Sequence, residues 1–160
     1  MPRSLQDELK QRKPFVSLEH EAVLSIARSA AQLEHQAAEA LKPHGVTPTQ
    51  YNALRILRGA GTAGLCRNEI RDRLVARVPD ATRLLDRLEA MALVVREREG
   101  EDRRFVCTRI TPAGRAVLAR LDGPIAALHE RQLGHLGPDR LRTLIDLLAL
   151  ARESPGPLLG

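Results

Sequence analysis

Apolar residues recur every three or four positions through most of this sequence, which is the period of an amphipathic helix. The pattern predicts helices over residues 17–46, 47–58, 69–74, 79–92, 112–133 and 137–152. Two β-like runs, 94–98 and 105–110, predict strands joined by a charged turn, and the second of them alternates with a period of two. Gly123-Pro124 is expected to kink or break the helix that it interrupts.

The predicted helix over 79–92 has a sharply divided surface. Its apolar stripe is formed by Ala81, Leu84, Leu85, Leu88 and Met91. Polar and charged residues fall on the other sides, and an arginine-rich turn follows between the two predicted strands. A helix with Thr82 and Arg83 near its start, followed by such a hairpin, is typical of a winged helix-turn-helix that reads DNA.

Residues that favour helix starts mark several boundaries. Ser17 is a good N-cap for the first long helix. Thr47 is expected to cap the next helix, with Gln50 reaching back to complete a capping box. Asn68 is expected to cap the short helix that follows, and Pro79 to lie in the first turn of the helix after it.

The order of elements predicts a winged helix-turn-helix flanked by N- and C-terminal dimerisation helices, in a mainly α fold with a small β-hairpin wing. The predicted parts are a polar N-terminal arm (1–16), a dimerisation helix (17–46), the winged helix-turn-helix domain (47–111), C-terminal dimerisation helices (112–152) and a flexible tail (153–160). Apolar stripes on helices that flank a DNA-binding module need a partner, which favours a homodimer. The alternative is that the first long helix only covers the core.

Charge favours an anionic partner but does not place it. The 160 residues carry a formal net charge of +5, and clustered positive charge releases counterions from nucleic acid. Between Arg67 and Arg104, however, ten Arg face nine Asp or Glu, a net charge of +1. A DNA-binding surface must therefore come from the placement of individual arginines.

Other functional classes find little support in the sequence. There is no Gly-rich phosphate loop, GxSxG, HExxH or Cys-His nucleophile pattern, so we expect no enzyme. Cys66 and Cys107 lie far apart without CxxC spacing, so neither a disulfide framework nor a zinc site is expected, and both are interpreted as small hydrophobic residues. No cofactor or metal is expected. No run approaches the roughly 18 apolar residues of a membrane helix, and no signal peptide is visible, so we expect a cytoplasmic protein without membrane contact.

Three stretches carry a resemblance to a known family: TPTQYNALRIL (47–57), VPDATRLLDRLEAMALVVRE (78–97) and EDRRFVCTRITPAGRAVL (101–118). In the last, Asp102 and Arg104 are followed by a strand and then by Ile110-Thr111-Pro112-Ala113-Gly114. On these residues the sequence resembles the MarR family of bacterial transcriptional regulators, over about residues 17–150. One departure is Ala92, where the family usually has Gly at the end of the recognition helix; a left-handed cap at Ala costs about 1 kcal/mol.

The resemblance implies a homodimer that binds a pseudo-palindromic double-stranded DNA operator. Family members usually act as repressors that a small ligand or oxidation releases. The ligand is often a small aromatic or phenolic anion, here expected among parts of residues 17–60 and 112–130. The family's peroxide sensors use a cysteine near the start of the first long helix, and this chain has none there. Two rival functions are a winged helix used only for protein interaction and a non-specific architectural DNA binder.

The candidate DNA-binding residues of the recognition helix and its connector are Arg77, Pro79, Asp80, Thr82, Arg83 and Arg87. Arg83 is placed to read guanine, and Thr82 a phosphate or a thymine methyl group. Arg77 and Arg87 are phosphate candidates, as are Arg67 and Arg71 of the preceding helix. The alternative for Arg83 is a solvated surface residue paired with Asp80 or Asp86.

The candidate residues of the wing are Asp102, Arg103 and Arg104. The resemblance places Arg104 at the wing tip, where it enters the minor groove. Asp102 is then expected to hold the guanidinium of Arg104 in position, and Arg103 to contact a phosphate. The alternative is a solvated hairpin turn.

Overall fold

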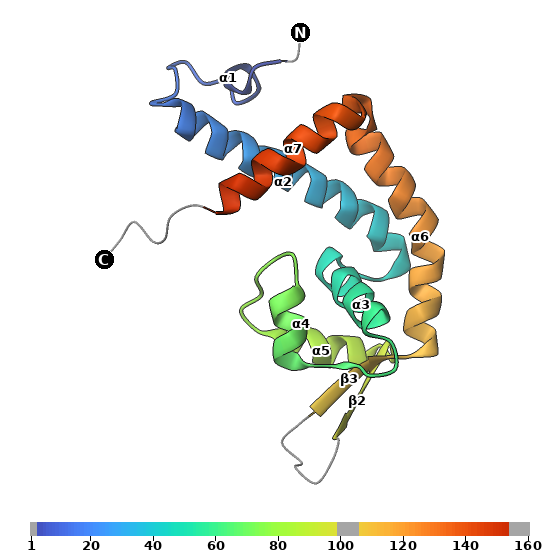
Figure 1. Ribbon diagram of the computed structural model, residues 1–160. Coiled ribbons are helices and arrows are strands. Elements are labelled where there is room, and N and C mark those ends of the chain that lie inside the picture. Colours follow the sequence, from blue (N-terminus) through green and yellow to red (C-terminus); the bar gives the residue numbers. More distant parts are fainter. Residues whose placement is uncertain (1–2, 99–105, 154–160) are drawn as a thin grey trace, which may run out of the picture. The chain divides into compact units, whose positions relative to one another are not determined.

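The structure is a computed structural model that describes residues 3–98 and 106–153 (Figure 1). The chain divides into two compact units, Met1–Leu118 and Ala119–Gly160. The first unit holds all of the strands of the described residues and the elements up to the start of α6. The second holds the remainder of α6 and the last helix.

The first unit opens with a short helix and a long one. α1 (Leu5–Glu8) lies within the segment predicted as a polar arm and was not foreseen. α2 (Leu18–Leu41) begins where predicted, because Ser17 accepts a hydrogen bond from the backbone N–H of His20 at 3.2 Å. A 3-10 turn, η1 (Lys42–His44), follows, and Gly45 ends it in the left-handed conformation. In α2, which is described throughout, only Leu41 is buried.

The predicted capping box at the start of α3 (Pro48–Ala60) is confirmed. Thr47 Oγ1 accepts from the backbone N–H of Gln50 at 3.2 Å, and Gln50 Oε1 accepts from the backbone N–H of Thr47 at 2.9 Å. These two bonds satisfy donors that a helix start leaves open. Leu54 and Leu57 are fully buried, so α3 provides a central part of the core.

The helix-turn-helix pair differs from prediction at both of its N-termini. α4 (Arg67–Arg73) begins after Cys66, whose backbone N–H donates to Glu69 Oε2 at 2.8 Å. The prediction that Asn68 caps this helix is therefore wrong, because the residue before the helix is already held by Glu69. α5 (Ala81–Ala90) is capped by Asp80, so Pro79 precedes the cap instead of lying in the first turn.

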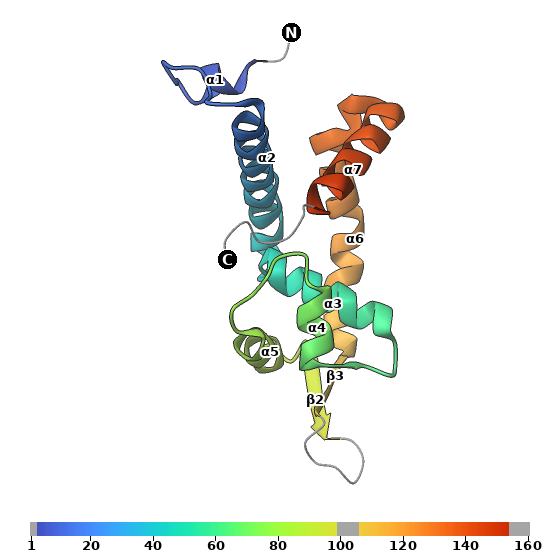
Figure 2. The same ribbon diagram turned by 60° about the vertical axis from the view of Figure 1, so that its left-hand side comes forward.

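The described residues form a three-stranded antiparallel sheet of order β1-β3-β2. β2 (Val94–Arg98) agrees with the predicted strand, and β3 (Val106–Ile110) agrees within the described residues. β1 (Leu65–Cys66) pairs with β3 and was missed, because two residues show no measurable alternation. In both views the β2–β3 hairpin extends away from α3, α4 and α5 (Figure 1 and Figure 2).

The end of α5 contains the unusual cap expected from its sequence. Ala92 has φ of 57°, in the left-handed region. Its backbone N–H donates to Glu89 O at 2.8 Å, and the N–H of Leu93 donates to Leu88 O at 3.0 Å. This is the Schellman pattern, in which Gly normally occupies the left-handed position. The two hydrogen bonds and the burial of Leu88 and Leu93 offset the strain at Ala92.

The start of α6 (Pro112–Leu133) is joined to that cap. Thr111 Oγ1 donates to Ala92 O at 2.8 Å and accepts from the backbone N–H of Gly114 at 3.1 Å. The backbone N–H of Thr111 donates to Leu93 O at 3.0 Å. A Cβ atom at Gly114 would lie 2.3 Å from Leu93 O. The motif Thr111-x-x-Gly114 therefore lets the backbone at the start of α6 pack directly against the backbone of Ala92 and Leu93.

Of the two C-terminal helices, one differs from the prediction and the other begins where predicted. α6 runs through Pro124 as one helix, so a break at Gly123-Pro124 is wrong. A 3-10 turn, η2 (Gly134–Leu136), leads to α7 (Gly137–Arg152), which begins where predicted. No residue of α7, all of which is described, is buried.

We expect Gly114→Ala to lower the free energy of unfolding by about 2–3 kcal/mol, because the added methyl group would overlap the backbone oxygen of Leu93. Gly59→Ala is the matched control, since a Cβ atom at this exposed position of α3 meets nothing within 4 Å. Helix propensity predicts that the control gains about 0.5–1 kcal/mol. Urea unfolding of both variants measures the difference, and equal stability would contradict the close contact at Gly114.

Candidate nucleic-acid interface

The recognition helix α5 buries one side and exposes another. Ala81, Leu85 and Leu88 are buried, and α5 contacts α4 and β2. Arg83 and Arg87 are exposed on the remaining surface. The predicted apolar stripe thus anchors the helix and leaves its arginines available.

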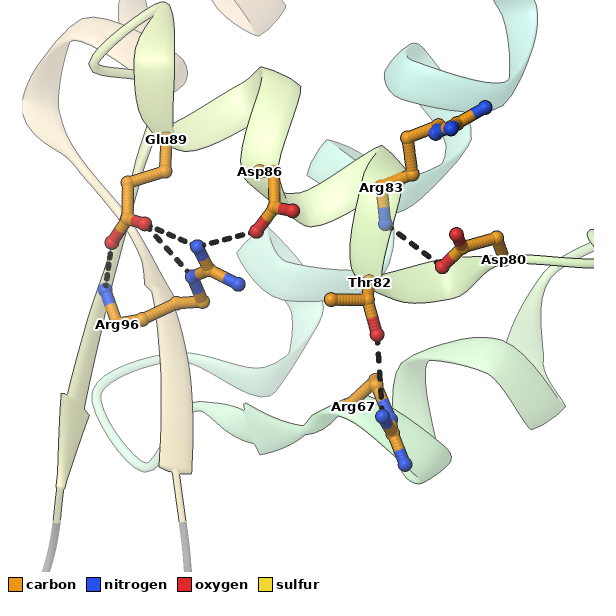
Figure 3. Close-up of polar contacts among 7 residues, drawn as sticks. All are labelled: Arg67, Asp80, Thr82, Arg83, Asp86, Glu89 and Arg96. Carbon is orange, nitrogen blue, oxygen red and sulfur yellow. Dashed lines mark hydrogen bonds and ion pairs between the residues drawn. The ribbon is translucent and has the colours of Figure 1, made fainter.

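The carboxylates close to Arg83 are engaged elsewhere. Asp80 Oδ1 accepts from the backbone N–H of Arg83 at 3.0 Å and so caps the helix. Asp86 pairs with Arg96 (Figure 3). The Arg83 side chain makes no hydrogen bond or ion pair with another described residue. Among the described residues, therefore, Arg83 forms neither of the two ion pairs that the sequence allowed, with Asp80 or with Asp86.

Arg96 of β2 binds two acidic residues of α5. Its Nη2 lies 2.7 Å from Asp86 Oδ1, its Nε donates to Glu89 Oε2 at 2.9 Å, and its backbone N–H donates to Glu89 Oε1 at 3.2 Å. The guanidinium bond lowers the pKa of the Glu89 carboxyl, and the same bond raises the pKa of Arg96. These contacts tie the recognition helix to the wing and offset part of the negative charge on the acidic side of α5.

A second contact connects the two helices of the helix-turn-helix. Arg67 Nη1, in the first turn of α4, donates to Thr82 Oγ1 at 3.2 Å (Figure 3). A charged donor holding a hydroxyl restricts the Thr82 rotamer, because the oxygen must point toward α4.

A side chain of α3 holds the backbone of the connector between α4 and α5. The backbone N–H of Val75 donates to Asn52 Oδ1 at 2.9 Å. Val75 itself is 92% exposed, and Arg77 and Pro79 are exposed as well. Asn52 thus fixes the backbone of a surface segment whose side chains face solvent.

Comparison with known proteins identifies the group to which this arrangement belongs. A family model described as the MarR family matches residues 44–104. A Bacillus subtilis protein described as the uncharacterized HTH-type transcriptional regulator YkoM is 32% identical over 126 residues, which are 78% of this chain and 80% of that protein. The chain belongs to the MarR family.

Solved structures agree with this assignment. A MarR transcription factor from Planctomyces limnophilus is 41% identical, with a TM-score of 0.66, over 86% of this chain and 99% of that one. The transcriptional repressor CouR bound to a 23-mer DNA duplex is 28% identical, with a TM-score of 0.73, over 94% and 99% of the two chains. The protein is therefore a MarR-family DNA-binding transcriptional regulator, in a family that is non-enzymatic. The resemblance and the fold class inferred from the sequence are confirmed.

The candidate wing residues of this MarR-family regulator, Asp102, Arg103 and Arg104, lie outside the described residues. The base of the wing is described. Arg109 Nε donates to Thr62 O at 2.7 Å, and Arg109 Nη1 donates to Glu97 Oε2 at 3.1 Å. Arg109 therefore joins both wing strands to the loop that follows α3.

Sequence reasoning missed the residues that position this MarR-family interface. They are Asn52, Arg67, Arg96 and Arg109. Arg67 was considered only as a phosphate contact, and the others were not singled out. Arg96 carries a weak signal, because a strand arginine directly after an acidic recognition helix can reach back to it.

The described part of this regulator contains no group of three His, Cys, Asp or Glu residues that could hold a metal ion. None of its described helices is long and apolar enough to cross a membrane.

We expect the stability that Glu89 contributes to depend on pH. Because folding lowers its pKa below the usual 4.5, the contribution is complete above about pH 4.5 and is lost as the pH falls through the folded-state value. Glu89→Gln should cost about 1 kcal/mol at neutral pH, a small value because 39% of the side chain is exposed.

Chemical unfolding at a series of pH values measures this effect. The difference between the wild type and Glu89→Gln should shrink towards acid pH. Glu34→Gln, at an exposed position of α2, is the control and should show little difference at any pH. A gap between wild type and Glu89→Gln that stays constant with pH would contradict the proposed role of Arg96.

Proposed function

We propose that this regulator represses transcription in the cytoplasm by binding a pseudo-palindromic operator as a homodimer, and that a small aromatic or phenolic ligand releases it. The observation that carries the proposal is the distribution of charge on α5. Arg96 engages Asp86 and Glu89, whereas Arg83 and Arg87 are exposed without a described partner. A recognition helix that presents two exposed arginines without intramolecular partners among the described residues fits the major groove.

Each candidate residue takes a role that its position allows. Arg83 reads guanine through a bidentate contact, and the Thr82 methyl group contacts thymine. Arg77 and Arg87 bind phosphates. Pro79 and Asp80 lie at the entrance of the groove.

The resemblance supplies the roles of the wing. Arg104 enters the minor groove, where a narrow groove concentrates negative potential. Asp102 orients it, and Arg103 binds the backbone. Repression is supported by CouR, which is described as a transcriptional repressor bound to DNA; the ligand class is supported by the family resemblance alone.

Exposed apolar side chains support the homodimer. On α2, Leu18 is 82% and Val23 is 63% exposed. On α7, Ile145 and Leu150 are 61% and 64% exposed. Such side chains on two long helices are stabilised when a second copy covers them.

Fluorescence anisotropy with the gene's own upstream DNA tests operator binding. Arg83→Ala and Arg104→Ala should each weaken binding by about 1–3 kcal/mol, and Arg83→Ala should also relax base preference. Arg87→Ala should weaken all duplexes alike and lower the salt slope by about 1. Arg142→Ala is the control, because this exposed residue pairs with Asp139 within α7.

Equal affinity for unrelated duplex at physiological salt would contradict sequence-specific binding and favour the architectural alternative. No affinity for any duplex would favour a protein-interaction module. Adding aromatic acids to the complex tests the ligand: release of DNA supports this part of the proposal, and retention throughout a broad panel speaks against it.

Light scattering tests the homodimer. The wild type should have twice the 17.7 kDa mass of one chain. Ile145→Glu should shift it towards the monomer, because a buried charge without a partner opposes association. Asp146→Glu, at the neighbouring exposed position, is the control. A wild type that stays monomeric would refute the dimer.

A further inference from the structure

The two cysteines of the chain, distant in sequence, are paired across the sheet. Cys66 of β1 and Cys107 of β3 are direct register partners in an antiparallel ladder. Both are thiols and both are half-buried. The sequence offered no reason to bring them together, because β1 is too short to be recognised as a strand.

The register places the two residues at a separation that suits a disulfide bond. Directly opposed residues of an antiparallel pair have Cα atoms about 4.5–5.5 Å apart, and disulfides span about 4.4–6.8 Å. Opposed side chains also lie on the same face of a sheet. The adjacent pair, Leu65 and Thr108, is buried, so the cysteine pair belongs to the opposite face.

A small molecule can reach both cysteines. A cavity of about 230 Å³ is lined by Cys66 and Cys107 together with Ala63, Gly64, Leu65, Glu69 and Val106. The two half-buried cysteines thus line one common cavity, through which a small oxidant can approach the pair.

We propose that Cys66 and Cys107 form a reversible intrachain disulfide with a low-molecular-weight disulfide as oxidant, and that this bond weakens operator binding. The second part rests on the proposed function. One protein thiolate attacks the small disulfide, whose S–S bond breaks and releases one small thiol. The other protein thiolate then attacks the protein sulfur of the mixed disulfide and releases the second small thiol. Two protein thiols are oxidised and one small disulfide is reduced.

The bond acts on the start of α4. Cys66 is the N-cap of this helix, and Arg67, the next residue, holds Thr82 of the recognition helix. Cys107 Sγ donates to Ala63 O at 3.1 Å, and this contact is lost when the sulfur joins Cys66. A bond to Cys107 re-orients the Cys66 side chain at the N-cap of α4, and therefore acts on the first turn, where Arg67 contacts Thr82.

Oxidation of the whole protein in mixtures of oxidised and reduced glutathione tests the site. The wild type should lose two hydrogens without gaining glutathione, because opposed thiols have a high effective concentration. Trypsin should then release peptides 59–67 and 105–109 as one linked species, which dithiothreitol separates. Stable glutathione adducts, or a disulfide between chains on a non-reducing gel, would overturn the proposal.

Single variants separate the bond from its consequence. Cys66→Ser and Cys107→Ser should each stop at the glutathione adduct, and reduced Cys66→Ser keeps a good N-cap. Oxidation should weaken operator binding of the wild type on the order of tenfold. If a variant misfolds, the tryptic peptide map of the oxidised wild type still shows whether Cys66 and Cys107 are linked. Unchanged affinity of the linked wild type would overturn the regulatory part, and reduced protein that binds no operator would instead reject the proposed function.

Discussion

The DNA-binding module depends on the hydrogen bonds and ion pairs that Arg96 forms with Asp86 and Glu89. Arg96 joins a strand of the wing to the recognition helix, so that the two parts expected to meet DNA are held as one body. It also places one positive charge against the two carboxylates of α5 and so offsets one of their negative charges. In a module whose arginines barely outnumber its acids, such pairing helps to decide which arginines remain available. The same guanidinium therefore serves geometry and electrostatics, and neither role requires it to touch DNA.

A second constraint lies where α5 ends. Just after the helix, Ala92 adopts the left-handed conformation, and Thr111 donates hydrogen bonds to the carbonyl oxygens of Ala92 and Leu93. Gly114 allows the start of α6 to approach so closely that no side chain fits. The exit of the recognition helix and the entry of α6 are thus one packed junction. Strain at Ala92 is tolerated because the surrounding hydrogen bonds leave the backbone no alternative.

Much of the fold could be predicted, because it follows from local patterns. Ser17 and Thr47 start helices by bonding to residues three positions away, and β3 lies where the alternation of its sequence predicts a strand. The prediction at Asn68 failed because a distant pairing sets where α4 begins. Asn68 is a good cap by composition, but β1 carries extended backbone up to Cys66. Within α6, helical backbone continues past Pro124, a residue that in isolation would favour a break.

The sequence by itself determined the helix faces, most of the caps and, through three motifs, the family and its general function. Only the tertiary structure decided that Arg96 pairs with Asp86 and Glu89, that Arg67 orients Thr82 and that Arg109 joins both wing strands to the loop after α3. It also decided that Cys66 faces Cys107. The reason is physical: caps and amphipathic faces depend on neighbours a few residues away, whereas these contacts depend on how β1, β3 and α5 pack, which no local period records.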